Sequence, residues 1–380
     1  MDNYLYPVFI LYCGLGDCIE KVKLFQKNLS IHHDFEKTLE AIRSENISLP
    51  PIPSVEDFDS NLFFPSGSGT IHYDKIECIE LDAKNGMEYL LSENVYGYDE
   101  SIEKYQALEG SAYFTSHSLI NLNSNVNDYV PSCYLTFYFY TKSKVLFEKN
   151  EYIKCVESST PSSDDLDDFS DNQFESAYKR DYAADRANLI KSIVLSNSIL
   201  FIDGPLIGGQ MNQYSVSLNN DLLASDVIPV FFVKNSSSNL IVDNVTELRS
   251  IYNSDMHWSY TFLKQGSKSE GFRTNFFRYE DSVNPEFSKV FCYLKPFKNR
   301  SPQRVEFHTK TFTKYESKIN SILDAIYYLL LVHGDINNPQ IRPIAISEVF
   351  ARQTLKLLNL NEMLSSTKLV PTMNEIRGFK

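Results

Sequence analysis

The feature that most constrains this fold is an apolar run over residues 199–202, Ile-Leu-Phe-Ile, that ends in Asp203-Gly204-Pro205. Four consecutive large apolar residues are typical of a strand that is covered on both faces of its sheet. Proline has no N–H to donate to a neighbouring strand, so Gly204-Pro205 predicts the end of this strand. Asp203 is therefore expected at the strand's C-terminal tip, either as a turn-forming residue or as a functional carboxylate.

A second segment of similar shape lies upstream, where residues 105–108 lead into Glu109-Gly110-Ser111. We interpret it as another strand that brings a carboxylate, that of Glu109, to the edge of a sheet. Between the two segments, residues 179–195 have helical spacing and an apolar stripe that Asp185 adjoins. Asp185 either faces solvent, as most helical aspartates do, or faces inward toward the two strand ends.

The order of these segments resembles the NurA family of nucleases. In that family an apolar strand enters Asp-Gly-Ser, a helix carries an acid, and a second apolar strand enters Asp-Gly. Glu109-Gly110-Ser111 is similar to the first motif, with Glu in place of Asp. Asp185 is similar to the acid on the helix, and Asp203-Gly204 is similar to the second motif. Two later segments are also similar to family strands: residues 228–238, which include Lys234, and residues 304–307, Arg-Val-Glu-Phe.

The resemblance, which runs from about residue 105 to residue 358, implies an α/β fold with an RNase H-like mixed sheet flanked by helices. Alternating β-forming residues over 134–141 predict a strand beside the one that enters Glu109. Helical spacing predicts helices over 315–331 and about 345–360. We expect a NurA-like domain over 101–380 and an N-terminal extension of unknown role over 1–100, with a strand at 6–12 and a helix-like region near 19–39.

The expected chemistry requires a cluster of carboxylates. Phosphodiester hydrolysis needs a deprotonated water and stabilisation of the extra negative charge on phosphorus, and divalent cations can supply both. Mg²⁺ and Mn²⁺ prefer oxygen ligands. The resemblance implies that Glu109, Asp185 and Asp203 bind Mn²⁺ or Mg²⁺, with Asp203 also acting in catalysis. Lys234 then contacts the scissile phosphate, although a solvated loop lysine is the alternative interpretation.

The C-terminal segment departs from the family pattern. Arg342 stands where the family has an active-site Tyr, and Phe350 stands where it has an active-site His. Phenylalanine can neither coordinate a metal nor transfer a proton. The leading hypothesis is a metal-dependent DNA nuclease, and the second is a catalytically degenerate subunit that dimerises and docks on a translocase. A third is an RNase H-like protein without nuclease activity that binds nucleic acid by aromatic stacking.

The formal net charge of -13 bears on the partners of the chain. It disfavours a protein that holds duplex DNA alone, because nonspecific affinity comes largely from Lys and Arg that displace counterions. Part of the charge lies in an acidic tract within residues 158–176, which has the composition of a solvated inserted loop or of an arm that docks on a basic partner. The resemblance implies a HerA-type hexameric DNA translocase as partner, in DNA end processing or defence against foreign DNA.

The resemblance also implies a homodimer, and 26 Phe and 24 Tyr residues are enough to cover an interface as well as a core. No long uncharged apolar run occurs, and the first residues lack the basic region of a signal peptide, so we expect a cytoplasmic protein that does not engage a membrane. The six cysteines are scattered, which is typical of reduced, structural thiols.

Overall fold

The computed structural model describes residues 23–24, 27–28, 61–63, 69–72, 76–122, 131–144, 153–156, 169–208, 211–234, 236, 238–243, 248, 251–264, 271–297, 299–335, 339–357 and 369–372. The chain divides into two compact units, Met1–Pro51 and Ile52–Lys380. In the first unit, β1 (Lys23–Leu24) and β2 (Lys27–Asn28) form an antiparallel pair, where the sequence predicts helix. The strand expected over 6–12 lies outside the described residues.

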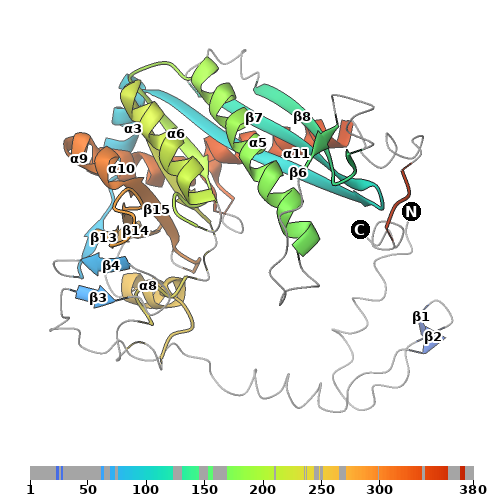
Figure 1. Ribbon diagram of the computed structural model, residues 1–380. Coiled ribbons are helices and arrows are strands. Elements are labelled where there is room, and N and C mark those ends of the chain that lie inside the picture. The colour runs from blue at the N-terminus through green and yellow to red at the C-terminus, as the bar shows by residue number, and fades with distance from the viewer. Residues whose placement is uncertain are drawn as a thin grey trace. The chain divides into compact units, whose positions relative to one another are not determined.

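The centre of the second unit is a mixed sheet, and five of its strands are consecutive neighbours. They are β8 (Ser132–Thr141), β7 (Gly110–Asn121), β6 (Asn94–Ala107), β10 (Ser198–Asp203) and β11 (Val227–Val233). Of these strands, β6, β7 and β8 are labelled in Figure 1. Strands β6, β7 and β8 form an antiparallel meander, β10 runs parallel to β6, and β11 runs parallel to β10. The mixed sheet flanked by helices is confirmed.

The sheet continues at both sides of this centre. Beyond β11 follow β15 (Gln303–His308), β14 (Lys289–Lys295), β13 (Phe277–Asp281), β4 (Gly69–His72) and β3 (Asn61–Phe63). A side branch of β12 (Phe272–Thr274) and β5 (Cys78–Glu80) pairs with β14. At the other side, β9 (Lys154–Cys155) pairs in parallel with the end of β8.

Helices cover both faces of the central strands. Helices α5 (Phe169–Ile193) and α6 (Asn212–Ala224) lie on one face, and α10 (Glu316–His333) and α11 (Arg342–Leu357) lie on the other (Figure 1). Helix α3 (Ala83–Ser92) packs on α10, α9 (Thr309–Lys314) follows β15, and α8 (Asp255–Lys264) packs beside β12 and β14. No helix among the described residues has the length and apolar character needed to cross a lipid bilayer.

Strand β10 is buried on both faces, as its apolar run predicts. Ile199 and Phe201 join the core beneath α10 and α11, whereas Leu200 and Ile202 join the core beneath α5 and α6. Successive side chains of a strand point to opposite faces, so both layers of helices depend on this strand. The prediction that β10 is an interior strand that ends at Asp203 is confirmed.

Several predicted elements are present with different limits. Helix α10 and helix α11 are confirmed, and α5 begins at Phe169, so the second half of the acidic tract is helical rather than loop. The first half of the tract, residues 158–168, lies outside the described residues. Strand β8 is confirmed, but it pairs with β7 and not with β6, the strand that enters Glu109. The boundary expected at residue 100 falls inside β6.

Candidate active site

The site begins where β6 and β10 run side by side. In their parallel register Tyr98 pairs with Ile202, so Asp99 and Asp203 follow at the same level. Directly paired residues point to the same face, and the alternation places both carboxylates on the face that α11 covers. Asp99 is only 6% exposed. Two acids from separate strands are thus held together by the sheet itself.

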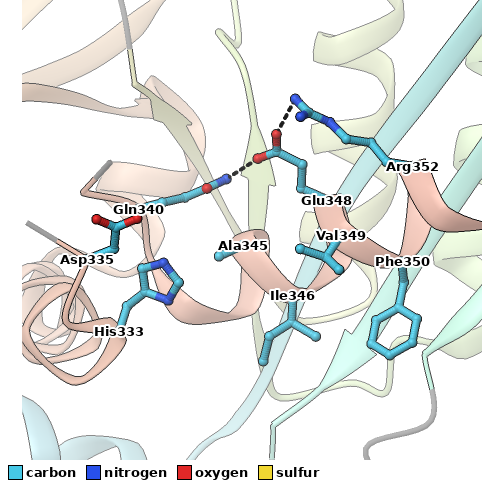
Figure 2. A pocket seen from close by; sticks show the side chains of 9 residues that line it. All are labelled: His333, Asp335, Gln340, Ala345, Ile346, Glu348, Val349, Phe350 and Arg352. Carbon is cyan, nitrogen blue, oxygen red and sulfur yellow. Dashed lines mark hydrogen bonds and ion pairs between the residues drawn. The ribbon is translucent and has the colours of Figure 1, made fainter. Parts of the chain in front are cut away.

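Lys234 links this pair of acids to α11. It directly follows β11, and its Nζ lies 3.2 Å from Asp203 Oδ2 and 2.9 Å from Glu348 Oε2. Glu348 is also held on α11 by Gln340, whose Nε2 donates to Oε2 at 2.8 Å, and by an ion pair with Arg352 (Figure 2). The side chains of Lys234, Asp203 and Glu348 are 20–25% exposed, so the cluster reaches solvent.

Two glycines explain how the backbone permits this arrangement. A Cβ on Gly97 of β6 would lie 2.4 Å from Pro343 Cβ, so only glycine lets α11 approach the sheet this closely. Ser347 then donates to the Gly97 carbonyl at 2.9 Å, which fixes the turn of α11 that carries Glu348. Gly204 has a φ of +92°, a conformation that favours glycine and turns the chain sharply after Asp203.

The charges of the cluster are not balanced. Burial, helped by the nearby Asp203 and Glu100 carboxylates, raises the pKa of Asp99 to about 8. Burial also raises the pKa of Asp203 to about 6, although Lys234 opposes this shift. Carboxyl groups whose pKa values are raised in this way do not have enough positive charge around them to offset burial.

Lys234 and Glu348 stay charged in the same surroundings. Burial alone would lower the pKa of Lys234, but the negative charges of Asp203, Glu348 and Asp99 outweigh it and raise that pKa. Burial opposes ionisation of Glu348, yet hydrogen bonds from Lys234 and Gln340 hold its pKa below the usual range. An ammonium ion therefore sits between two of the three carboxylates.

The donor set fits a hard divalent cation. Asp99, Asp203 and Glu348 supply oxygen ligands, and the raised pKa values of the two aspartates are what a bound cation would reverse. In the described part of the chain, no group of three or more His, Cys, Asp or Glu side chains is placed so that it could hold a metal ion. Lys234 contacts two of the carboxylates and occupies the space between them.

Glu100 lies on the opposite face of β6, beneath α5. It pairs across the strands with His117, and its charge acts on Asp99, Asp203 and the side chains of Tyr182 and Arg186 on α5. Its Oε2 is buried and has no hydrogen-bond partner among the described residues. Burial and the charge of Arg186 lower the pKa of His117 to about 4, so this histidine is neutral.

Glu109 is not part of this cluster. It lies in the short turn between β6 and β7, where its Oε2 accepts a hydrogen bond from Val370 N at 3.0 Å. A strand rises about 3.3 Å per residue, which places the turn roughly 30 Å from Asp99 along β6. The segment interpreted as a strand end is a hairpin turn, and the structure does not bring Glu109 to Asp203.

Asp185 also points elsewhere. Tyr138 of β8 donates to its Oδ2 at 2.5 Å, and Lys154 and Asp181 are the nearby charges. Burial raises the pKa of Asp185. The α5 residue whose charge interacts with Glu100 of β6 is its neighbour Arg186, which is 7% exposed.

The two departures from the family pattern lie on α11. Arg342 is its exposed first residue. Phe350 is half-buried and lines a pocket of about 500 Å³ that adjoins Glu348 (Figure 2). The other lining residues are His333, Asp335, Gln340, Ala345, Ile346, Glu348, Val349 and Arg352.

Sequence reasoning missed Asp99 and Glu348. The sequence does contain a pattern that could have identified Asp99. Residues 95–98 form a strand-like segment with apolar and aromatic residues, and the Asp99-Glu100-Ser101 that follows has Asp and Ser at the same spacing as the Asp-Gly-Ser of the first family motif. Glu348 carries no comparable signal, since nothing around it in the sequence distinguishes it from a solvated helical glutamate.

Comparisons with known proteins point to one family. The NurA domain profile matches residues 137–351, more than half of the chain. No curated protein sequence matches the chain. The matched range begins within β8, so it includes Asp203, Lys234 and Glu348 but not Asp99.

Three solved structures are among those to which the chain is similar. The NurA nuclease from Sulfolobus solfataricus has a TM-score of 0.40 and 10% identity, and the match covers 72% of this chain and 85% of that chain. NurA bound to dAMP and manganese has a TM-score of 0.39 and 8% identity, with 76% and 88% covered. Ciona intestinalis endonuclease V in complex with inosine-containing DNA has a TM-score of 0.33 and 13% identity, with 70% and 87% covered. Similarity at this level assigns no role to any residue here.

Proposed function

The chain belongs to the NurA domain family, and we propose that it is a divalent-metal-dependent DNA nuclease with its metal site at Asp99, Asp203 and Glu348. The observation that carries this proposal is that Lys234 contacts both Asp203 and Glu348, while Asp99 lies near enough for its charge to interact with Asp203 and Lys234. The three carboxylates come from β6, β10 and α11, and a cation would offset the burial, and the smaller repulsion, that raise the pKa values of Asp99 and Asp203.

Each residue has a role that follows from its contacts. A bound Mn²⁺ or Mg²⁺ supplies an activated water and neutralises charge on the phosphate. Asp99 and Asp203 are held rigid by the sheet, and Gln340 and Arg352 orient Glu348. Lys234 keeps its proton, so its ammonium group can contact a phosphate oxygen. Glu109 and Asp185 lie apart from these groups and are not included.

We also propose the biological setting that the family suggests: a cytoplasmic homodimer that acts with a HerA-type hexameric translocase in DNA end processing or defence against foreign DNA. The net charge of -13 supports the need for a partner that delivers DNA.

A catalytically degenerate, docking subunit is the second candidate. The observations in its favour are Phe350 in place of a metal-binding or proton-transferring residue, and the occupation of the space between Asp203 and Glu348 by Lys234.

The test is cleavage of labelled single- and double-stranded DNA by the purified protein with Mn²⁺, Mg²⁺ or a chelator, with and without the translocase. We expect metal-dependent cleavage that Asp203→Asn abolishes. Asp221→Asn is the matched control, because this aspartate pairs with Lys191 on the surface of α6. A wild-type protein that binds the translocase but cleaves no DNA under any of these conditions favours the degenerate subunit.

A further inference from the structure

We propose that the buried ion pair between Arg304 and Glu306 positions the two segments that carry Asp203 and Lys234. The inference rests on the proposed function only in taking these two residues as site residues. Neither Arg304 nor Glu306 contacts the candidate site. Both lie on β15, the strand next to β11.

Glu306 fixes the chain that leaves Asp203. It is fully buried, and its Oε1 lies 2.6 Å from Lys289 Nζ and 2.7 Å from Arg304 Nε. Its Oε2 accepts a hydrogen bond from Leu206 N at 2.8 Å. Leu206 follows Asp203 after the turn at Gly204, so this bond determines where the chain goes beyond the tip of β10.

Arg304 fixes the chain that leaves Lys234. It is 5% exposed, and its Nη1 donates to Ser236 Oγ at 2.9 Å. Ser236 comes two residues after Lys234, and the residue opposite Arg304 in β11 is Val233. The same guanidinium therefore connects the Lys234 segment to Glu306 and, through it, to the Asp203 segment.

The pair acts from behind the sheet. Val305 lies between Arg304 and Glu306 in β15 and packs in the core beneath α10 and α11. The two charged side chains consequently point to the opposite face from Glu348. Any effect on the site must pass through the backbones of the two segments.

A structural role alone is a poor explanation for this arrangement. Buried ion pairs are often no more stabilising than apolar residues of the same volume, because desolvation offsets the attraction. Here a carboxylate and two cations, Lys289 among them, are each at most 5% exposed. Two of the hydrogen bonds that the pair makes, to Leu206 and Ser236, go to the segments that follow the two site residues. A role in holding the Asp203 and Lys234 segments in position accounts both for the burial of these charges and for the two hydrogen bonds to those segments.

Two variants test the tether from its two ends. Arg304→Lys keeps a positive charge beside Glu306, but one ammonium cannot reproduce the planar fork that reaches both Glu306 and Ser236. Ser236→Ala removes the other end of the same bond at a less buried position. Ser225→Ala is the matched control, since its hydroxyl bonds the Asp221 carbonyl in a surface turn.

Two readouts separate positioning from simple stability. The first is DNA cleavage, for which we expect kcat to fall about tenfold or more in both variants with KM unchanged, because small displacements of reacting groups are costly. The double variant should be no worse than the more severe single one, as expected for two ends of one contact. The second is acylation of Lys234 by a succinimidyl ester, measured by peptide mass spectrometry with Lys314 as internal reference.

We expect acylation of Lys234 to rise severalfold in both variants and to stay unchanged in Ser225→Ala. Unchanged acylation of Lys234 in both variants, whether or not the melting temperature falls, overturns the inference. The acylation readout does not need nuclease activity. If the wild type cleaves no DNA while Lys234 acylation still rises in both variants, the proposed nuclease is refuted and the positioning role is supported.

Discussion

Replacement of Lys234 by methionine should tighten Mn²⁺ binding. The ammonium group lies 3.2 Å from Asp203 Oδ2 and 2.9 Å from Glu348 Oε2, so it competes for oxygen atoms that a metal would use. Lys234→Met keeps most of the apolar side chain and removes only the charge. The carboxylates then repel one another without a counter-charge, and a bound cation gains more by joining them.

The size of the effect follows from Coulomb's law. A cation bound about 2.1 Å from Asp203 Oδ2 would lie at most about 5 Å from the ammonium group. The repulsion between charges of +2 and +1 at that distance is about 1.7 kcal/mol in the dielectric of water, and larger at partly buried positions. Affinity for Mn²⁺ should therefore rise by more than about tenfold at low salt.

Calorimetric titration of the chelator-treated protein with Mn²⁺ measures this change. Lys191→Met is the control, because Lys191 forms a surface ion pair with Asp221 at 2.7 Å and should leave the affinity unchanged. Cleavage by Lys234→Met should fall even as metal binds more tightly, since the contact to phosphate is lost. If Lys234→Met binds Mn²⁺ no more tightly than the wild type, the metal does not share the carboxylates that Lys234 contacts, and the proposed site is refuted.

Three further expectations concern charge and assembly. Asp203→Asn should abolish metal-dependent cleavage while the metal-free melting temperature stays equal or rises, because a buried carboxylate with a raised pKa is removed; a marked loss of melting temperature would contradict this. Asp99 has a pKa of about 8 in the folded protein, so it binds a proton more tightly in the folded state than in the unfolded state. The stability of the metal-free protein should therefore decrease as the pH rises from about 4 to about 8. Thermal melts with chelator should show this slope reduced in Asp99→Asn, and equal slopes would contradict the assignment. Light scattering should give twice the chain mass of 43.7 kDa, and a concentration-independent single-chain mass would refute the dimer.

Much of the local structure can be read from neighbouring residues. The apolar run over 199–202 and the Gly204-Pro205 that follows it predict β10, its burial on both faces and the place of Asp203 at its tip. Helical spacing likewise predicts α10 and α11. These features depend on periodicity and turn chemistry, which lie within a few residues of one another.

Hairpin turns and strand ends are harder to distinguish. Glu109 and Asp99 both follow a strand-like segment and precede a serine, so either suits a site acid. The register of β6 against β10 separates them, since only Asp99 comes level with Asp203. Pairing between strands about a hundred residues apart leaves no periodic trace in the sequence of either one.

The sequence by itself determined strand β10, helices α10 and α11, the family and the place of Asp203, because local patterns and ordered motifs specify them. Only the tertiary structure decided which charges meet. On α5, Asp185 is bonded to Tyr138, whereas the next residue, Arg186, interacts with Glu100 of β6. Lys234 and Glu348, 114 residues apart, meet because Gly97 lets α11 lie directly on the sheet. Side-chain direction and close approach depend on packing among distant segments, which sequence neighbours do not encode.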